Sequence, residues 1–332
     1  MQTTATVQSS PINIRLIHLI ILYAIVPLAL LIAVMDQFVW GRAILLVSPF
    51  RPESWVIWVY FFGMPHVIGG MQMFADTEYL EKYGWRLGRI LAVCLLLPVV
   101  VGAMFGQQAM FLVFMSFIVY HTVAQQFGLT LVALKRPPDL FFYVWKWSTI
   151  GVAGVMYTMM YWVPFPIVLF DTWLREPLMS VAGLLLVSVA LSAGLLMWKN
   201  RANGLGVLYV AANMALIVTE FYLFSAHYYF LVVIVGRIIH EFTAWPIYVA
   251  HEHNRNLVST PNWIYRWFRG VLPTGVLALV VAFAVGFALM YSTSIVPFMT
   301  SIVISLSIYH YYTEHFLWRR GGLLRDHVNF TQ

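Results

Sequence analysis

The chain of 332 residues is poor in cysteine and in charge. Its single cysteine, Cys94, excludes an internal disulfide and a site built of thiolates, so any bound metal must be held by imidazole or carboxylate groups. Charged residues make up only 10% of the chain and hydrophobic residues 61%, with a mean hydropathy of +0.81. A soluble protein of this length has no core large enough to bury so much apolar surface. The composition therefore predicts a protein embedded in lipid.

Long apolar runs are what the chain has instead. A helix needs about 18 or more apolar residues to cross roughly 30 Å of hydrocarbon. We count ten such runs, which cover residues 16–35, 55–74, 87–104, 109–134, 142–170, 178–198, 204–221, 226–250, 270–290 and 295–318. They predict an all-α polytopic membrane protein with about ten transmembrane helices. No repeat, low-complexity tract or long soluble insert divides the chain, which indicates a single transmembrane domain over residues 1–332.

Two runs have features that modify this expectation. The fifth contains Pro164 and Pro166, so we expect its helix to kink or to end early. The apolar stretch 43–47 is too short to cross a membrane, and we expect it to lie at the interface.

Lysine and arginine are concentrated in alternate loops. With a cytoplasmic N-terminus, the inner loops hold Lys82, Arg86, Arg89, Lys135, Arg136, Lys146, Lys199, Arg201, Arg255, Arg266, Arg269, Arg319, Arg320 and Arg325. The outer loops hold only Arg42, Arg51 and Arg175. The positive-inside rule then predicts ten crossings with both termini in the cytoplasm. Basic loops that face anionic lipid headgroups also account for the net charge of +6, so no nucleic-acid partner is predicted.

Four histidines lie inside the second, fourth, eighth and tenth apolar runs. They are His66, His121, His240 and His310, and each precedes the polar stretch that ends its run by about 9 to 14 residues. Because even-numbered runs cross in the same direction, all four are expected at similar depth. An ionisable side chain in hydrocarbon costs about 2.5 to 3.5 kcal/mol or more unless it meets a partner, a cavity or an ion. The shared depth favours one metal site for the four together. Taken singly, each histidine fits a hydrogen bond between two helices as well as it fits a metal ligand.

Polar residues close to these histidines are candidates for supporting roles. Gln125 lies one helical turn after His121, where it can orient a ligand or hold a water. Arg237 and Glu241 are spaced i, i+4, and we expect them to pair because neither tolerates lipid alone.

The tenth run adds a carboxylate and a fifth histidine. Glu314 shares a helical face with His310 and is a candidate metal ligand or base. His315 is included among the candidate ligands, although its side chain is expected to point about 140° away from His310 and to lie nearer the cytoplasm.

The ligand types narrow the choice of metal. Neutral imidazoles with one carboxylate suit iron, zinc or copper, and an open coordination position suits a non-heme Fe(II) enzyme that activates O2. A site inside the membrane suits a lipophilic substrate. A haem electron carrier is one alternative, since two pairs of histidines on facing helices can ligate haem. A proton-coupled transporter that uses the same histidine, glutamate and arginine side chains is the other.

Four short patches resemble motifs of a known family. They are Met64-Pro65-His66, His121 with Phe127-Gly128, His240-Glu241, and His310 with the closing Trp318-Arg319. Their order is similar to that of the bacterial and archaeal Brp/Blh family of membrane β-carotene 15,15'-dioxygenases. The resemblance implies a multi-pass protein of the inner (plasma) membrane, non-heme iron held by the four histidines, and oxidative cleavage of a carotenoid or another polyene.

The chain departs from the family pattern at several places. Gly70 and either Gln125 or Gln126 stand where the family has aspartates, Ala244 replaces a second histidine of the third motif, and His315 replaces an aspartate of the last. These departures change the set of candidate metal ligands. A relative of the family that acts on a lipid other than β-carotene fits the motifs equally well.

Overall fold

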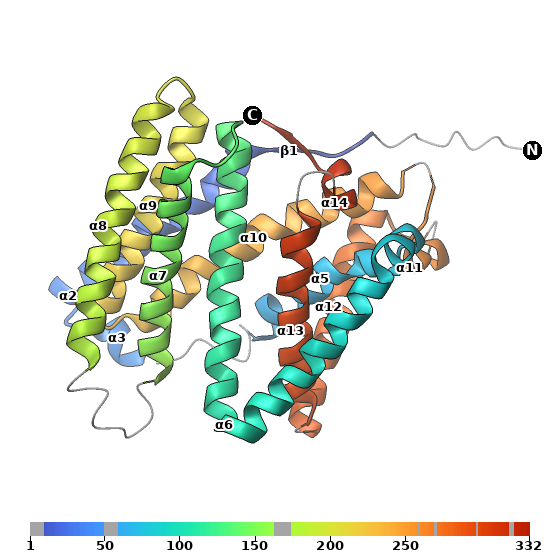
Figure 1. The fold of residues 1–332 in the computed structure, drawn as a ribbon, viewed down its shortest axis with the longest axis horizontal. Helices are drawn as coiled ribbons and strands as arrows, with labels where there is room; N and C mark the ends of the chain where they lie inside the picture. Colours follow the sequence, from blue (N-terminus) through green and yellow to red (C-terminus); the bar gives the residue numbers. More distant parts are fainter. Residues whose placement is uncertain are drawn as a thin grey trace, which may run out of the picture.

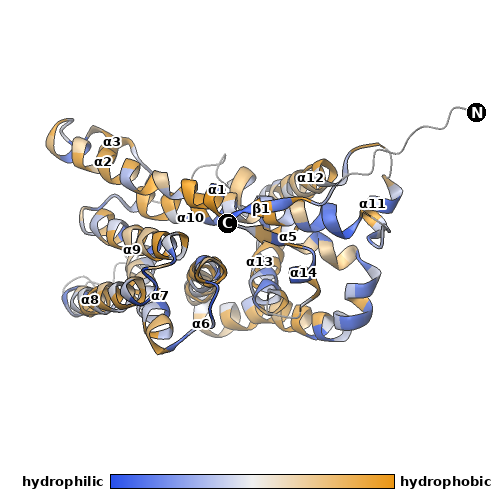
Figure 2. Ribbon diagram, turned by 90° about the horizontal axis from the view of Figure 1, so that it is seen from above, coloured by the Kyte–Doolittle hydropathy of each residue, from blue (hydrophilic) through white to orange (hydrophobic). Residues whose placement is uncertain are grey.

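The computed structural model describes residues 10–49, 59–162, 174–257, 259–268, 271–296, 298–318 and 322–332. Long helices make up most of this part of the chain (Figure 1). Seven helices are long and apolar enough to cross a membrane: Leu16–Phe38, Thr77–Gly106, Ala109–Leu134, Arg175–Lys199, Gly204–Ser225, Tyr229–Arg255 and Thr274–Ile295. Figure 2 shows hydrophobic residues throughout them, while hydrophilic ribbon is more prominent near β1 and α11. The chain is a multi-pass membrane-embedded protein built of helices.

The elements follow the predicted apolar runs because a backbone inside lipid must satisfy its own hydrogen bonds. The first run forms α1 (Leu16–Ile20), η1 (Ile21–Ala24) and α2 (Ile25–Phe38), followed by the short α3 (Ala43–Val47). The later elements are η3 (Val59–Gly63), α5 (Met64–Met71), η4 (Gln72–Ala75), α6 (Thr77–Leu134), α7 (Leu140–Trp162), α8 (Arg175–Lys199), α9 (Gly204–Ser225), α10 (Tyr229–Arg255), α11 (Trp263–Trp267), α12 (Thr274–Ile295), α13 (Phe298–Leu317) and α14 (Leu323–Asp326).

Helix α6 contains both the third and the fourth predicted spans. It bends sharply at Gly106, whose φ of +85° is in the left-handed region that glycine adopts without strain. Figure 1 shows two arms that diverge from this bend, the second of which packs beside α7 and α13. The loop expected at residues 106–108 is therefore a bend within one long helical element.

The second predicted span is a broken helix. A π-helical turn, η3, leads into the eight-residue α5, in which Pro65 occupies the first turn, and a 3-10 turn, η4, follows. Proline lacks the backbone N–H and restricts the residue before it, which explains why the regular helix begins only at Met64. The described part of the predicted span 55–74 is therefore a discontinuous helix, and residues 55–58 lie outside the described residues.

The remaining two predicted spans, α7 and α13, are helical but less apolar than the seven. They have 23 and 20 residues, and neither reaches the hydropathy of the seven apolar helices. Pro164 and Pro166 lie outside the described residues, as do the loop arginines Arg51, Arg269, Arg319 and Arg320. The short run 43–47 is an exposed helix, with Leu46 80% and Val47 82% accessible, as expected of a segment that does not cross.

The first and last described segments of the chain meet at one end of the bundle. Strand β1 (Asn13–Arg15) pairs in parallel with β2 (Asn329–Thr331), which adds a small sheet to the predicted all-α fold. The side-chain oxygen of Asn254 accepts a hydrogen bond from the backbone N–H of Ile12. Its side-chain nitrogen donates to the backbone carbonyls of Ile12 and His327. The first and last described segments therefore lie at the same end of the helical bundle (Figure 1).

Gly286 of α12 sets how closely that helix approaches α5. A Cβ at this position would lie 2.7 Å from the backbone nitrogen of Pro65. We predict that Gly286→Ala destabilises the protein by about 1 to 3 kcal/mol, because added volume at a tight contact forces the helices apart. The matched control is Gly183→Ala on α8, where no atom lies within 4 Å and alanine favours the helix. Melting temperatures of the two variants in detergent test this, and an unchanged value for Gly286→Ala contradicts it.

Candidate metal centre

Four histidines from four different helical segments meet in the interior. His66 comes from α5, His121 from the second arm of α6, His240 from α10 and His310 from α13. Their exposed fractions are 2%, 5%, 1% and 0%. The structure thus brings together the four side chains for which the sequence predicts a common depth.

The spacing of the imidazole nitrogens suits a single metal ion. Nε2 of His66 lies 3.2 Å from Nε2 of His240 and 3.2 Å from Nε2 of His310. Nitrogens that are each about 2.1 Å from one ion lie roughly 3 to 3.4 Å apart in tetrahedral or octahedral geometry. The ring of His121 completes the group, with centroids 4.8 Å from His240 and 5.2 Å from His310.

The donor chemistry of this group also fits a cation. A neutral imidazole has one N–H and one lone pair, so Nε2 of His66 can satisfy only one of the two nitrogens that face it. Protonating the rings instead would place positive charge in a buried apolar interior, at high cost. A metal ion accepts lone pairs from all the Nε2 atoms together. Within the described residues, His66, His121 and His310 have ligand atoms within 4.8 Å of one another, as do His66, His240 and Glu241.

Glu241 connects His66 to Arg237. Its Oε2 is 3.0 Å from Nδ1 of His66, and its Oε1 is 3.0 Å from a guanidinium nitrogen of Arg237. A carboxylate at Nδ1 fixes the imidazole tautomer so that Nε2 presents its lone pair to a metal. The predicted i, i+4 pair is present in the structure. In the described part of the chain, the Nδ1 atoms of His240 and His310 have no hydrogen-bond partner.

Glu314 lies on the other side of the histidine group. Its Oε2 is 3.6 Å from Nε2 of His121, and it accepts a hydrogen bond from the Tyr248 hydroxyl. The same hydroxyl is 3.4 Å from Nε2 of His66, so Tyr248 connects the carboxylate to the histidines. The sequence reasoning missed Tyr248. Its position seven residues after Glu241, and hence on the same face of α10, is the signal that would have indicated it.

Gly70 gives the imidazole of His310 the room it needs. A Cβ on Gly70 would lie 2.5 Å from Cε1 of His310, 2.8 Å from its Nδ1 and 2.9 Å from the Tyr248 hydroxyl. The small residue one turn after His66 therefore allows α13 to bring its histidine against α5, in the close approach that small residues permit.

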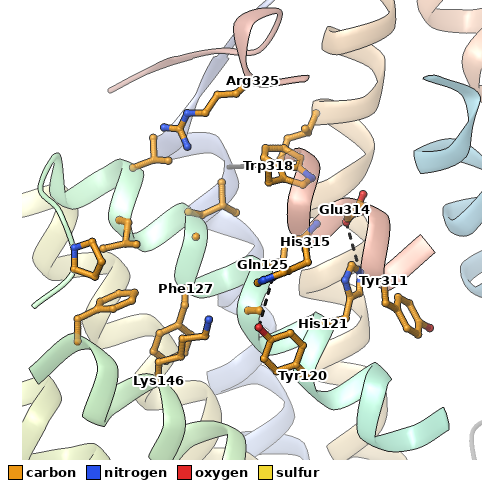
Figure 3. A pocket seen from close by; sticks show the side chains of 18 of the residues that line it. Tyr120, His121, Gln125, Phe127, Lys146, Tyr311, Glu314, His315, Trp318 and Arg325 are labelled. Atoms are coloured by element: carbon orange, nitrogen blue, oxygen red, sulfur yellow. Dashed lines mark hydrogen bonds and ion pairs between the residues drawn. The ribbon is translucent and has the colours of Figure 1, made fainter. Parts of the chain in front are cut away.

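Two predicted site residues lie apart from the histidine group. His315 is exposed, and its Nδ1 is 3.5 Å from the Tyr120 hydroxyl. Both polar atoms of the Gln125 side chain are buried without a hydrogen-bond partner in the described structure. Figure 3 shows His315 turned toward Tyr120, while Glu314 points to His121.

A cavity of about 380 Å³ lies directly beside the four histidines. His121 and Glu314 form part of its wall, and residues from α6, α7, α10, α13 and the C-terminal segment form the rest (Figure 3). Most of the lining is apolar or aromatic, as in pockets for small organic ligands. Of the four histidines, His121 is the one that lines the described cavity.

No protein-family model, curated protein or solved structure matches the chain. The resemblance to the Brp/Blh family stays a prediction based on four short motifs. The function must therefore be argued from the geometry of the site.

We predict that Gly70→Ala lowers metal affinity by about 10- to 100-fold, the usual effect of disturbing the surroundings of a ligand. The new methyl group displaces the His310 ring and the Tyr248 hydroxyl. Gly154→Ala on α7, where nothing lies within 4 Å, is the matched control. Elemental analysis of the two purified variants measures the effect, and equal metal content would count against this geometry.

A second prediction concerns the buried ion pair. Glu241→Gln leaves the Arg237 guanidinium without its carboxylate, which costs about 3 to 5 kcal/mol for a buried pair. The double variant Arg237→Met/Glu241→Leu is expected to recover most of the thermal stability, because neither charge remains. Melting temperatures of the single and double variants test the pairing, and a double variant as unstable as the single one argues against it.

Proposed function

We propose that the chain is a membrane-embedded, non-heme Fe(II) oxygenase that acts with O2 on a lipophilic substrate, such as a carotenoid or another polyene. The observation that carries the proposal is the meeting of three buried imidazole nitrogens, in which Nε2 of His240 and Nε2 of His310 each lie 3.2 Å from Nε2 of His66. A structural polar core would satisfy its donors and acceptors internally, whereas this group leaves lone pairs directed at one point.

The donor set supports iron. Imidazole nitrogens with a carboxylate suit Fe(II), and Glu314 is a carboxylate that both lies 3.6 Å from Nε2 of His121 and lines the cavity. Iron bound by the histidines would supply the activation of O2.

The protein residues contribute orientation, a dry surrounding and a proton site. Glu241 holds the tautomer of His66, and the apolar cavity keeps water away from the reacting centre. Tyr248 donates to the Glu314 carboxylate, so the proton of this pair is held at the Tyr248 oxygen, which lies 3.4 Å from Nε2 of His66.

Topology supports a cytoplasmic location for both termini. The β1–β2 pairing joins the first and last described segments, and α6 both begins and ends near that same end (Figure 1). The basic residues Lys82, Arg86 and Arg89 lie in the first turns of α6, and Lys135 and Arg136 follow its last residue. With the positive-inside rule, this favours ten crossings of the inner membrane of a bacterium or archaeon.

A proton-coupled transporter is the second candidate, because of one observation. The segment η3–α5–η4 is a discontinuous helix that carries a buried histidine, and transporters bind ions at such breaks. A haem carrier is disfavoured because the histidine ring centroids lie only 4.7 to 5.2 Å from their nearest neighbours, with no space for a macrocycle between them.

The first test is elemental analysis with an optical spectrum on detergent-purified protein. We predict near-stoichiometric iron without a Soret band, lost in both His121→Ala and His310→Ala. His315→Ala serves as the control and is expected to keep its iron, because His315 lies apart from the histidine group. Metal-free wild-type protein that remains folded would overturn the oxygenase and favour the transporter. A Soret band would indicate haem.

A further inference from the structure

The cavity beside the histidines has an unusual combination of apolar walls and unsatisfied polar groups. Phe127, Leu131, Phe142 and Ile247 contribute apolar surface. Gln125 and Lys146 are part of the same lining. A cavity for a pure hydrocarbon has no use for either polar group, since each would remain desolvated and without a partner when the ligand is bound.

Gln125 is the first indication of a polar ligand group. Both its Nε2 and its Oε1 are buried, and neither has a hydrogen-bond partner within the described structure. Buried amides are almost always hydrogen-bonded, so an amide that lines a cavity without a partner points to a ligand that completes it. Its N–H groups donate and therefore suit an oxygen acceptor.

Lys146 is the second, independent indication. Its ammonium lies 5.5 Å from the ring centroid of Tyr120 and 5.7 Å from that of Trp147. No carboxylate of the described residues forms an ion pair with it, although it is within a helix of the bundle. A cation at this position has aromatic faces around it but no anion. An anionic oxygen group is the missing partner.

We infer that the cavity binds a long-chain carboxylic acid, with its carboxylate at Lys146 and Gln125 and its apolar chain along the wall that leads to His121 and Glu314. The inference rests on the proposed function and narrows its substrate class. A single-chain acid suits the volume of about 380 Å³, which is near the lower end of the range of small-molecule pockets. A phospholipid with two acyl chains and a headgroup is too large for it.

Binding of cis-parinaric acid, a fluorescent polyene fatty acid, tests this on the full chain in phosphatidylcholine nanodiscs. We expect saturable binding of the acid and weaker binding of its methyl ester, which has the same chain without the charge. Lys146→Met is expected to weaken binding of the acid by about 10- to 100-fold and to leave the ester nearly unchanged, as for the loss of a hydrogen bond to a charged group. Gln125→Leu is expected to weaken binding of the acid as well.

Lys82→Met is the matched control. Lys82 also lies 5.5 Å from a tyrosine ring centroid, that of Tyr83, but it is outside the cavity lining. Its substitution is expected to leave binding of the acid unchanged. Equal binding of acid and ester, or equal losses in the Lys146→Met and Lys82→Met variants, overturns the inference.

Two further measurements distinguish a failure of this inference from a failure of the proposed oxygenase. If phosphatidylglycerol in the nanodisc displaces the acid while phosphatidylcholine does not, the anion that binds Lys146 is a lipid headgroup and the acid assignment is wrong. Iron content is measured on the same samples. Acid binding by iron-free protein would leave the inference standing without the oxygenase, whereas iron-loaded protein that binds acid and ester equally would retain the oxygenase alone.

Discussion

The cost of polar groups in hydrocarbon is the constraint on which the rest of the structure depends. Each of the four histidines would be unfavourable on an isolated transmembrane helix, and the fold lowers this cost by bringing them to one point. Glu241 and Arg237 lower the cost of their own burial in the same way, because the Glu241 carboxylate contacts His66 on one side and the Arg237 guanidinium on the other. The helices are therefore held in register by polar chemistry, while their lipid-facing sides specify little beyond hydrophobicity.

The broken second segment and the bent α6 place the ligands within this constraint. Pro65 starts a short regular helix directly before His66, and the glycines Gly70 and Gly286 let α13 and α12 approach it. The bend at Gly106 directs the two arms of α6 to different places, and the second arm brings His121 to the group. These local irregularities of the backbone thus bring together side chains that come from distant parts of the sequence.

The sequence predicted the membrane class, the depth of the histidines and the Arg237–Glu241 pair, because each follows from composition or helical spacing along one segment. It did not predict the lateral contacts, since periodicity within a helix says nothing of which neighbour it faces. Tyr248 was missed for this reason. The extent of the break in the second segment was not predicted either, because it depends on how the residues around Pro65 pack against α12. His315 follows His310 by five residues on the same helix, and the helical rotation over these residues directs its side chain to the cavity.

The pairing of β1 with β2 has a consequence for biosynthesis. The strand formed by residues 13–15 is synthesised long before its partner at residues 329–331. His66 and His310 are separated in the same way, by 244 positions. A nascent chain that ends before His310 therefore has neither the β1–β2 pairing nor a complete set of histidines, so the centre cannot form before α13 has been made.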